Sequence, residues 1–147
     1  MKPIDIPGRW AGVFALCLTC LLSGCNSRVA ITGKVLNDGQ PLPKAELRWA
    51  SETDSSFFAG GISDASGNII VDAQGKRELP VGKYKVTVLW WRLANGKPLP
   101  DGEEGTAAKS KPGAAKQYSA TLDVEITRGT SQVDLDVTGK GSVVGES

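Results

Sequence analysis

The feature of this sequence that most restricts its fold is a series of short segments in which apolar and polar residues alternate. Within residues 84–91, Tyr84, Val86, Val88 and Trp90 fall on one side of an extended chain, and the residues between them fall on the other. Successive side chains of a strand point to opposite faces of a sheet, so this period predicts a strand with one buried face. One wet face favours antiparallel pairing over the fully buried strands of a parallel sheet.

Turn signals separate these segments at intervals of 10 to 20 residues. Asp38-Gly39, Asp64 to Gly67, and Arg128-Gly129 all contain a glycine that can adopt positive φ, and aspartate can bond the backbone two residues on. The pattern predicts an all-β fold, a seven-stranded antiparallel β-sandwich with immunoglobulin-like architecture. The last two strands are expected to form a hairpin. The seven predicted strands are 29–36, 45–50, 57–63, 68–72, 84–91, 121–126 and 133–137.

Two segments lack the strand pattern. Residues 92–118 are predicted to form a long flexible loop, and loops of this length are usually functional or disordered. Residues 139–147 are predicted to be a frayed C-terminal tail.

The first 25 residues have the pattern of a secretory signal. Lys2 and Arg9 precede an apolar run of about 13 residues, and Ser23, Gly24 and Cys25 follow this run. A spanning helix needs about 20 apolar residues, so a permanent transmembrane helix is not expected. All three cysteines lie in this part of the chain and no histidine occurs anywhere, so a metal or redox cluster is the weaker interpretation.

Removing residues 1–24 takes away two of the 17 basic residues and one of the 16 acidic residues. The remaining chain is therefore close to neutral. A neutral domain without a basic patch does not suit nucleic acid, so no nucleic-acid partner is predicted.

The sequence Leu22-Ser23-Gly24-Cys25 resembles the lipobox of bacterial lipoproteins. The resemblance implies cleavage between Gly24 and Cys25 and a diacylglycerol on the Cys25 thiol, which would make residues 25–28 a lipidated tether. Two or three acyl chains anchor a protein stably to a membrane. Asn26 after the cysteine is similar to the sorting signal for the outer membrane. The alternative is an ordinary secreted protein with a chance cysteine.

Four longer pieces together resemble the transthyretin-like, or carboxypeptidase regulatory-like, β-sandwich over residues 29–138. The chain is similar to small lipoproteins of this fold in planctomycete-type bacteria, although Ile69 and Ile70 stand where that family often has an aromatic residue. The pieces, in order, are ITGKVLNDGQPLPKAELRW, GISDASGNI, LPVGKYKVTV and LDVEITRGTSQVDLDV.

The resemblance also brings in one enzyme, the hydroxyisourate hydrolase, whose chemistry relies on histidines, an arginine and a C-terminal Tyr-Arg-Gly-Ser. This chain has no histidine and ends in VVGES. The sequence therefore predicts that the chain is not an enzyme and holds no metal or cofactor. Asp101, Glu103 and Glu104 are interpreted as solvated loop charges, with weak calcium binding and catalysis as alternatives.

Trp90, Trp91 and Arg92 are the candidate ligand-binding residues. Alternation directs one indole inward and the other outward, and exposed tryptophan faces stack on sugars and lipids. In the structural alternative, Trp90 fills the edge of the core and Trp91 packs under the following loop.

The predicted function is a membrane-anchored, non-catalytic lipoprotein of the bacterial cell envelope, with a structural or ligand-binding sandwich. The alternative is a carbohydrate-binding module that uses an exposed tryptophan. The predicted partners are membrane lipid through Cys25 and an envelope glycan or protein.

Overall fold

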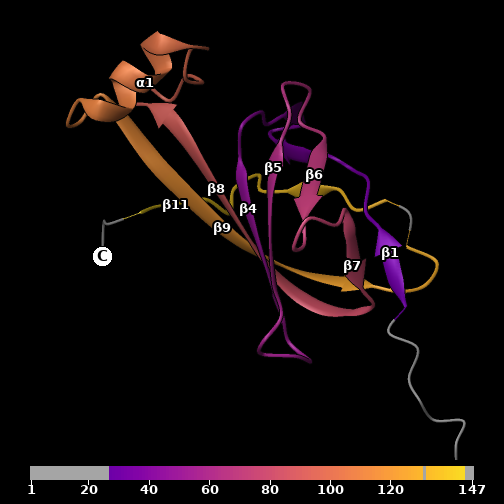
Figure 1. Cartoon of the computed structure of the whole chain (residues 1–147). Helices are drawn as coiled ribbons and strands as arrows, with labels where there is room; N and C mark the ends of the chain where they lie inside the picture. The colour runs from indigo at the N-terminus through magenta and orange to yellow at the C-terminus, as the bar shows by residue number, and fades with distance from the viewer. Residues whose placement is uncertain (1–26, 131, 145–147) are drawn as a thin grey trace, which may run out of the picture.

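The computed structural model describes residues 27–130 and 132–144, and most of them lie in β-strands. Figure 1 shows a sandwich from which a long two-stranded arm extends, and the arm carries the helix α1 at its end. The elements are β1 (Arg28–Ala30), β2 (Val35–Asn37), β3 (Gln40–Pro41), β4 (Glu46–Ser51), β5 (Phe58–Ser63), β6 (Ile69–Asp72), β7 (Glu78–Pro80), β8 (Gly82–Leu93), α1 (Glu103–Ser110), β9 (Ala115–Ile126), β10 (Leu135–Asp136) and β11 (Ser142–Val143).

These strands form three sheets. The largest is antiparallel throughout, with the order β11-β9-β8-β4-β5-β6. The strands β1 and β7 form an antiparallel pair, and β10, β2 and β3 form a sheet in which β10 runs parallel to β2. Residues of all three sheets meet in one core, so the predicted all-β sandwich is confirmed. The described residues contain eleven strands rather than seven, and one pairing is parallel.

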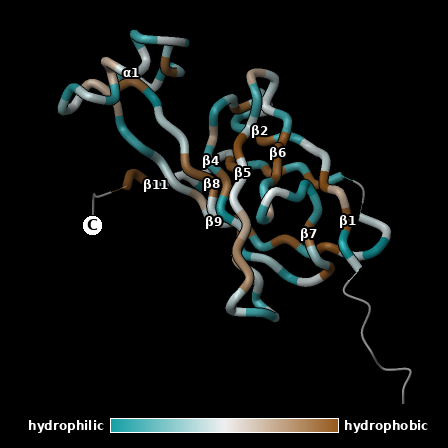
Figure 2. Tube along the Cα trace, in the orientation of Figure 1, coloured by the Kyte–Doolittle hydropathy of each residue, from teal (hydrophilic) through white to brown (hydrophobic). Residues whose placement is uncertain are grey.

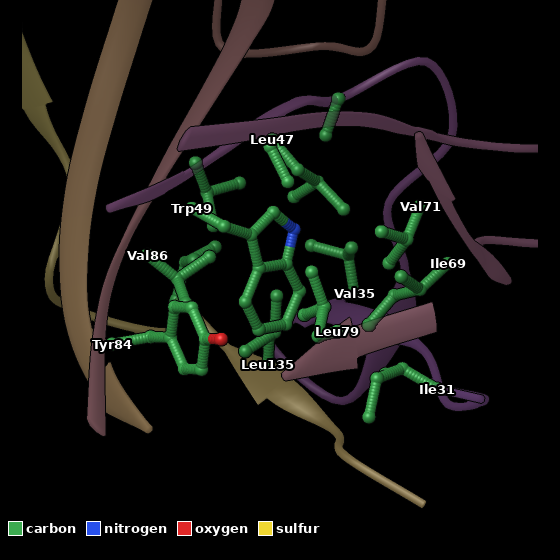
Figure 3. Packing of buried hydrophobic residues seen from close by; sticks show 14 of the residues in the cluster. Ile31, Val35, Leu47, Trp49, Ile69, Val71, Leu79, Tyr84, Val86 and Leu135 are labelled. Carbon is green, nitrogen blue, oxygen red and sulfur yellow. The ribbon is translucent and has the colours of Figure 1, made fainter. Parts of the chain in front are cut away.

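The core is centred on Trp49, whose side chain is fully buried. Figure 3 shows its indole enclosed by Val35, Leu79 and Leu135 from the small sheets and by Tyr84 from the large one. The rings of Trp49 and Tyr84 meet edge to face, with centroids 6.1 Å apart. Burying an aromatic side chain of this size removes roughly 150–250 Å² from water, worth about 4–6 kcal/mol.

The predicted first strand, 29–36, is divided at Gly33. One part, β1, pairs with β7, and the other, β2, pairs with β3 and β10. Gly33 has φ of 144°, and a Cβ at this position would lie 1.9 Å from the carbonyl oxygen of Val133. Only glycine permits this approach, because any side chain would collide with a backbone that cannot yield. The chain therefore changes sheets at Gly33.

The predicted hairpin between residues 121 and 137 is wrong. The strand β9 pairs with β8 along its whole length, whereas β10 crosses to the other layer and pairs in parallel with β2. The N–H of Leu135 donates to the carbonyl of Lys34 at 2.7 Å, and the N–H of Val133 donates to that of Thr32 at 2.8 Å. Alternation indicates which face is buried and leaves the partner strand undetermined, so a hairpin and a crossover have the same pattern.

The turn at Asp64 forms as predicted. The Asp64 carboxylate accepts the N–H groups of Ser66 and Asn68 at 2.8 Å each, and Gly67 has φ of 78°. Two hydrogen bonds from Asn68 lower the pKa of Asp64, and the one from its side chain has a larger effect than the one from its backbone N–H. This turn aligns β5 and β6 so that Ile62 lies opposite residue 70.

The structure corrects the predicted loop and the predicted tail. Within residues 92–118, β8 continues to Leu93, β9 begins at Ala115, and α1 lies between them. In the tail, β11 adds a strand beside β9, and the N–H of Val144 donates to the carbonyl of Gln117 at 2.8 Å. Figure 2 shows that the arm leading to α1 is mostly hydrophilic, which explains why no core-facing pattern marked these elements in the sequence.

A candidate ligand-binding cavity at the base of α1

A cavity of about 560 Å³ lies where the arm leaves the sandwich. Three segments line it: residues 37–44 around β3, the end of β8 at Trp91 and Arg92, and residues 98–109, which include most of α1. Two of the three predicted binding residues, Trp91 and Arg92, are therefore in its wall. Prolines and leucines of the first and third segments supply much of the remaining surface.

The third segment is held over β8 by a tight turn. The N–H of Gly96 donates to the carbonyl of Leu93 at 2.8 Å, and the N–H of Leu93 donates to that of Lys97 at 2.9 Å. Further along, a Cβ on Gly105 would lie 2.4 Å from the carbonyl oxygen of Pro100. The glycine in the first turns of α1 thus lets the helix pack directly on the proline-rich segment that lines the cavity.

Trp90 and Trp91 lie on opposite faces of β8, as alternation predicted. Trp90 is 3% exposed and stacks on Tyr118 of β9, with ring centroids 5.8 Å apart. Trp91 is half-buried, and the ammonium group of Lys109 in α1 lies 5.6 Å from the centroid of its ring. A cation over an exposed indole is worth about 0.5–1 kcal/mol. Trp91 therefore faces the cavity, whereas Trp90 belongs to the core and does not line it.

Charged groups of both signs surround the cavity. Lys44, before β4, forms an ion pair with Asp101, before α1, and this pair joins two of the three segments. Both side chains are largely exposed, so the pair contributes about 0–1 kcal/mol. Arg92 donates to the carbonyl of Gly96 at 3.4 Å, the one hydrogen bond of its guanidinium to the described residues. Most of its five N–H donors are thus available to a ligand.

Sequence reasoning missed the part of the site that α1 and the proline segment contribute. Helix signals are present, since Glu103 and Glu104 open the helix and Lys109 lies in its last turn, as the helix dipole favours. Over eight residues that signal is weak. Lys44 and Pro41 also reach the cavity, because the turn after β2 folds toward the arm.

The other predicted functional features lie elsewhere. Among residues 27–130 and 132–144, no group of three histidine, cysteine or acidic side chains is placed to hold a metal ion. In the same described part, no helix has the length and apolar character to cross a membrane. The predicted cleavage and lipidation positions, Gly24 and Cys25, lie outside the described residues. The predicted tether includes Ser27 and Arg28, but Arg28 starts β1 and the carbonyl of Ser27 accepts the N–H of Val81 at 3.0 Å.

No family model matches this chain, and no curated protein matches it. Solved structures do show similarity. The 5-hydroxyisourate hydrolase of Klebsiella pneumoniae is 18% identical with a TM-score of 0.40, and the match covers 77% of this chain and 94% of that one. An (S)-allantoin synthase is 15% identical with a TM-score of 0.44, covering 80% of this chain and 43% of that one. A 9R-lipoxygenase from Cyanothece PCC8801 is 18% identical with a TM-score of 0.34, covering 74% of this chain and 15% of that one.

These matches correct the prediction that the chain is not an enzyme. The hydrolase and the synthase are enzymes, so a sandwich of this kind is not evidence for a protein without activity. At these TM-scores the likeness assigns no reaction to this chain. The described residues form a β-sandwich with a cavity, and Trp91 is part of the wall of that cavity.

Proposed function

We propose that this chain is a lipid-anchored protein of the bacterial cell envelope whose transthyretin-like sandwich binds a saccharide in the Trp91 cavity. The observation that carries the proposal is the cavity itself. Its volume of about 560 Å³ falls within the range of small-molecule sites, and it combines an indole face with a rim of polar side chains.

The chemistry of the wall favours a saccharide over a purely apolar ligand. A sugar ring presents an apolar face that can stack on Trp91, and it carries hydroxyl groups around its edge. Gln40, Arg92 and the paired Lys44 and Asp101 supply donors and acceptors around that indole. The Lys109 ammonium, 5.6 Å from the ring centroid, would move aside or bond to the ligand.

The proposed anchor is supported by the lipobox-like Leu22 to Cys25 and by the position of the first described strand. In Figure 1 the described chain begins at β1, at the opposite end of the molecule from α1. Ser27 is already bonded to the sandwich, so one residue, Asn26, would separate it from a lipidated Cys25. The short tether would hold the β1 end near the membrane and leave the cavity facing away from it.

Metabolic labelling tests the anchor. Cells that express the full chain are grown with a tritiated palmitate, and the protein is isolated and counted. We expect label in the natural chain and none in the Cys25→Ser variant. The matched control is Cys20→Ser, which keeps the label because that cysteine lies before the proposed cleavage position. An unlabelled natural chain would refute lipid anchoring.

Titration with sugars tests the cavity. Intrinsic tryptophan fluorescence of the protein is followed during addition of a panel of oligosaccharides, with unfolding checked by circular dichroism. We expect a saturable change with one class of sugar and its loss in Trp91→Ala. The control is Phe58→Ala, which removes an aromatic side chain that is 64% exposed and lies outside the cavity. If no sugar gives a saturable change, saccharide binding is excluded.

A further inference from the structure

A second cavity, of about 180 Å³, adjoins the Trp91 cavity. The two share Asn37 and Arg92. The remaining wall of the second cavity comes from Asp38, from Trp90, Gly96 and Tyr118 of the arm, and from the chain between β10 and β11. A Cβ on Gly141 in that chain would lie 2.7 Å from the indole of Trp90, so the glycine lets this segment close against the ring.

The wall shared by the two cavities is rich in hydrogen-bond donors. Asn37 is 9% exposed and contributes an amide, and Arg92 contributes a guanidinium. Both side chains can therefore donate to an acceptor group of a ligand that reaches this wall.

Arg92 is the one charged residue that lines both cavities, although cations and carboxylates are equal in number around the two: Lys44, Arg92 and Lys109 against Asp38, Asp101 and Glu103. Of the three cations near the two cavities, Lys44 is paired with Asp101 and Lys109 lies over the indole of the larger cavity. Arg92 is the cation between the cavities. Asp38 is the one carboxylate that lines the smaller cavity, and it is exposed, so water screens its charge.

We infer that the two cavities together bind an acidic saccharide, with a sugar ring on Trp91 and its carboxylate between Arg92 and Asn37. The inference rests on the proposed saccharide binding and adds the charge of the ligand. A carboxylate accepts two parallel N–H bonds from a guanidinium, which an ammonium cannot offer in that geometry. The amide of Asn37 adds a further donor beside it.

The test compares two probes that share one sugar backbone, the first with ionised carboxyl groups and the second with neutral methyl esters. Binding of trigalacturonic acid and of its methyl ester to the full-length protein is measured by isothermal titration calorimetry at low salt. We expect the acid to bind about tenfold to a hundredfold more tightly than the ester, as a charge-assisted hydrogen bond provides. Arg92→Gln is expected to remove this preference, because it weakens binding of the acid and leaves binding of the ester unchanged. Arg92→Lys is expected to restore part of the preference.

Arg128→Gln is the matched control, because it removes the same charge from the turn after β9, away from both cavities. It should leave the preference for the acid intact. Equal affinity for acid and ester overturns this inference and leaves the saccharide site standing. Failure of both probes and of neutral sugars to bind overturns the inference together with the proposed function. If Arg92→Gln still binds the acid more tightly than the ester, another group of the protein binds the carboxylate. That result also overturns the inference.

Discussion

The two halves of β8 belong to one continuous strand and have different surroundings. In the sandwich half, Tyr84, Val86 and Val88 are at most 1% exposed, because the small sheets cover them. In the arm half, Trp91 and Arg92 are half-buried and line a cavity. The strand and its pairing with β9 continue without a break between the two halves. Trp91 lies on the face of β8 opposite to these core residues, and no side chain of the strand beyond Trp90 is buried.

The comparison indicates how this fold can hold a binding site without weakening its core. The backbone of β8 is fixed along its whole length by twelve paired positions with β9, and its half in the sandwich is anchored around Trp49. The side chains beyond Trp90 have no core to fill. They are therefore available for a ligand at little cost to stability.

The largest expected effect is the difference in stability lost when Trp49 and Trp91 are each replaced. Trp49→Ala should destabilise the protein by about 3–5 kcal/mol, because it leaves a large cavity among residues of all three sheets. Trp91→Ala should cost less than about 1 kcal/mol, since its side chain is only half-buried. Urea unfolding followed by circular dichroism measures both. Similar losses in the two variants would contradict the assignment of Trp49 to the core and of Trp91 to the site.

The change of sheets at Gly33 gives the next largest effect. Gly33→Ala should cost about 2–4 kcal/mol, because the new methyl group meets the backbone of Val133 in a conformation that disfavours side chains. Gly129→Ala is the control, since a Cβ there meets no atom within 4 Å. It should change stability by less than about 0.5 kcal/mol. Equal effects in a urea titration would show that the sheet change tolerates a side chain.

Acidic pH should lower the free energy of unfolding of the sandwich through the turn at Asp64. Hydrogen bonds from Asn68 lower the pKa of Asp64, so the folded state binds this proton more weakly than the unfolded state. The stabilisation is present above the unfolded pKa near 3.8 and is lost as the pH falls through the lower folded value. Asp64→Asn should therefore flatten the fall in stability below about pH 4. Urea midpoints measured between pH 2 and pH 6 check this, and an unchanged slope would exclude Asp64 as a contributor.

The smallest effect concerns the helix of the arm. Lys109→Gln removes the cation over Trp91, so α1 should open more often while global stability changes by less than about 1 kcal/mol. Hydrogen exchange of the α1 amides should become faster, and exchange in β4 should not change. Lys97→Gln, a cation outside the cavity lining, is the control. Slower or unchanged exchange in α1 would show that this contact does not hold the helix.

Part of this arrangement could be predicted from residue order. Alternation identified the buried faces of β4 and β8, and the Asp64 turn followed from aspartate and glycine chemistry at fixed spacing. These are local properties, in which the residues that carry the signal are also those that form the structure. For the same reason the opposite orientations of Trp90 and Trp91 could be read from the period of the strand.

The sequence by itself determined the β class, the buried faces and two residues of the cavity wall. The tertiary structure decided which elements meet: that β10 lies beside β2, that the chain changes sheets at Gly33, and that α1 closes over Trp91. Alternation has a period of two and carries no information about the partner, so distant contacts are set by how the layers pack around Trp49. The cavity depends on those contacts, because its three segments come from separate parts of the chain.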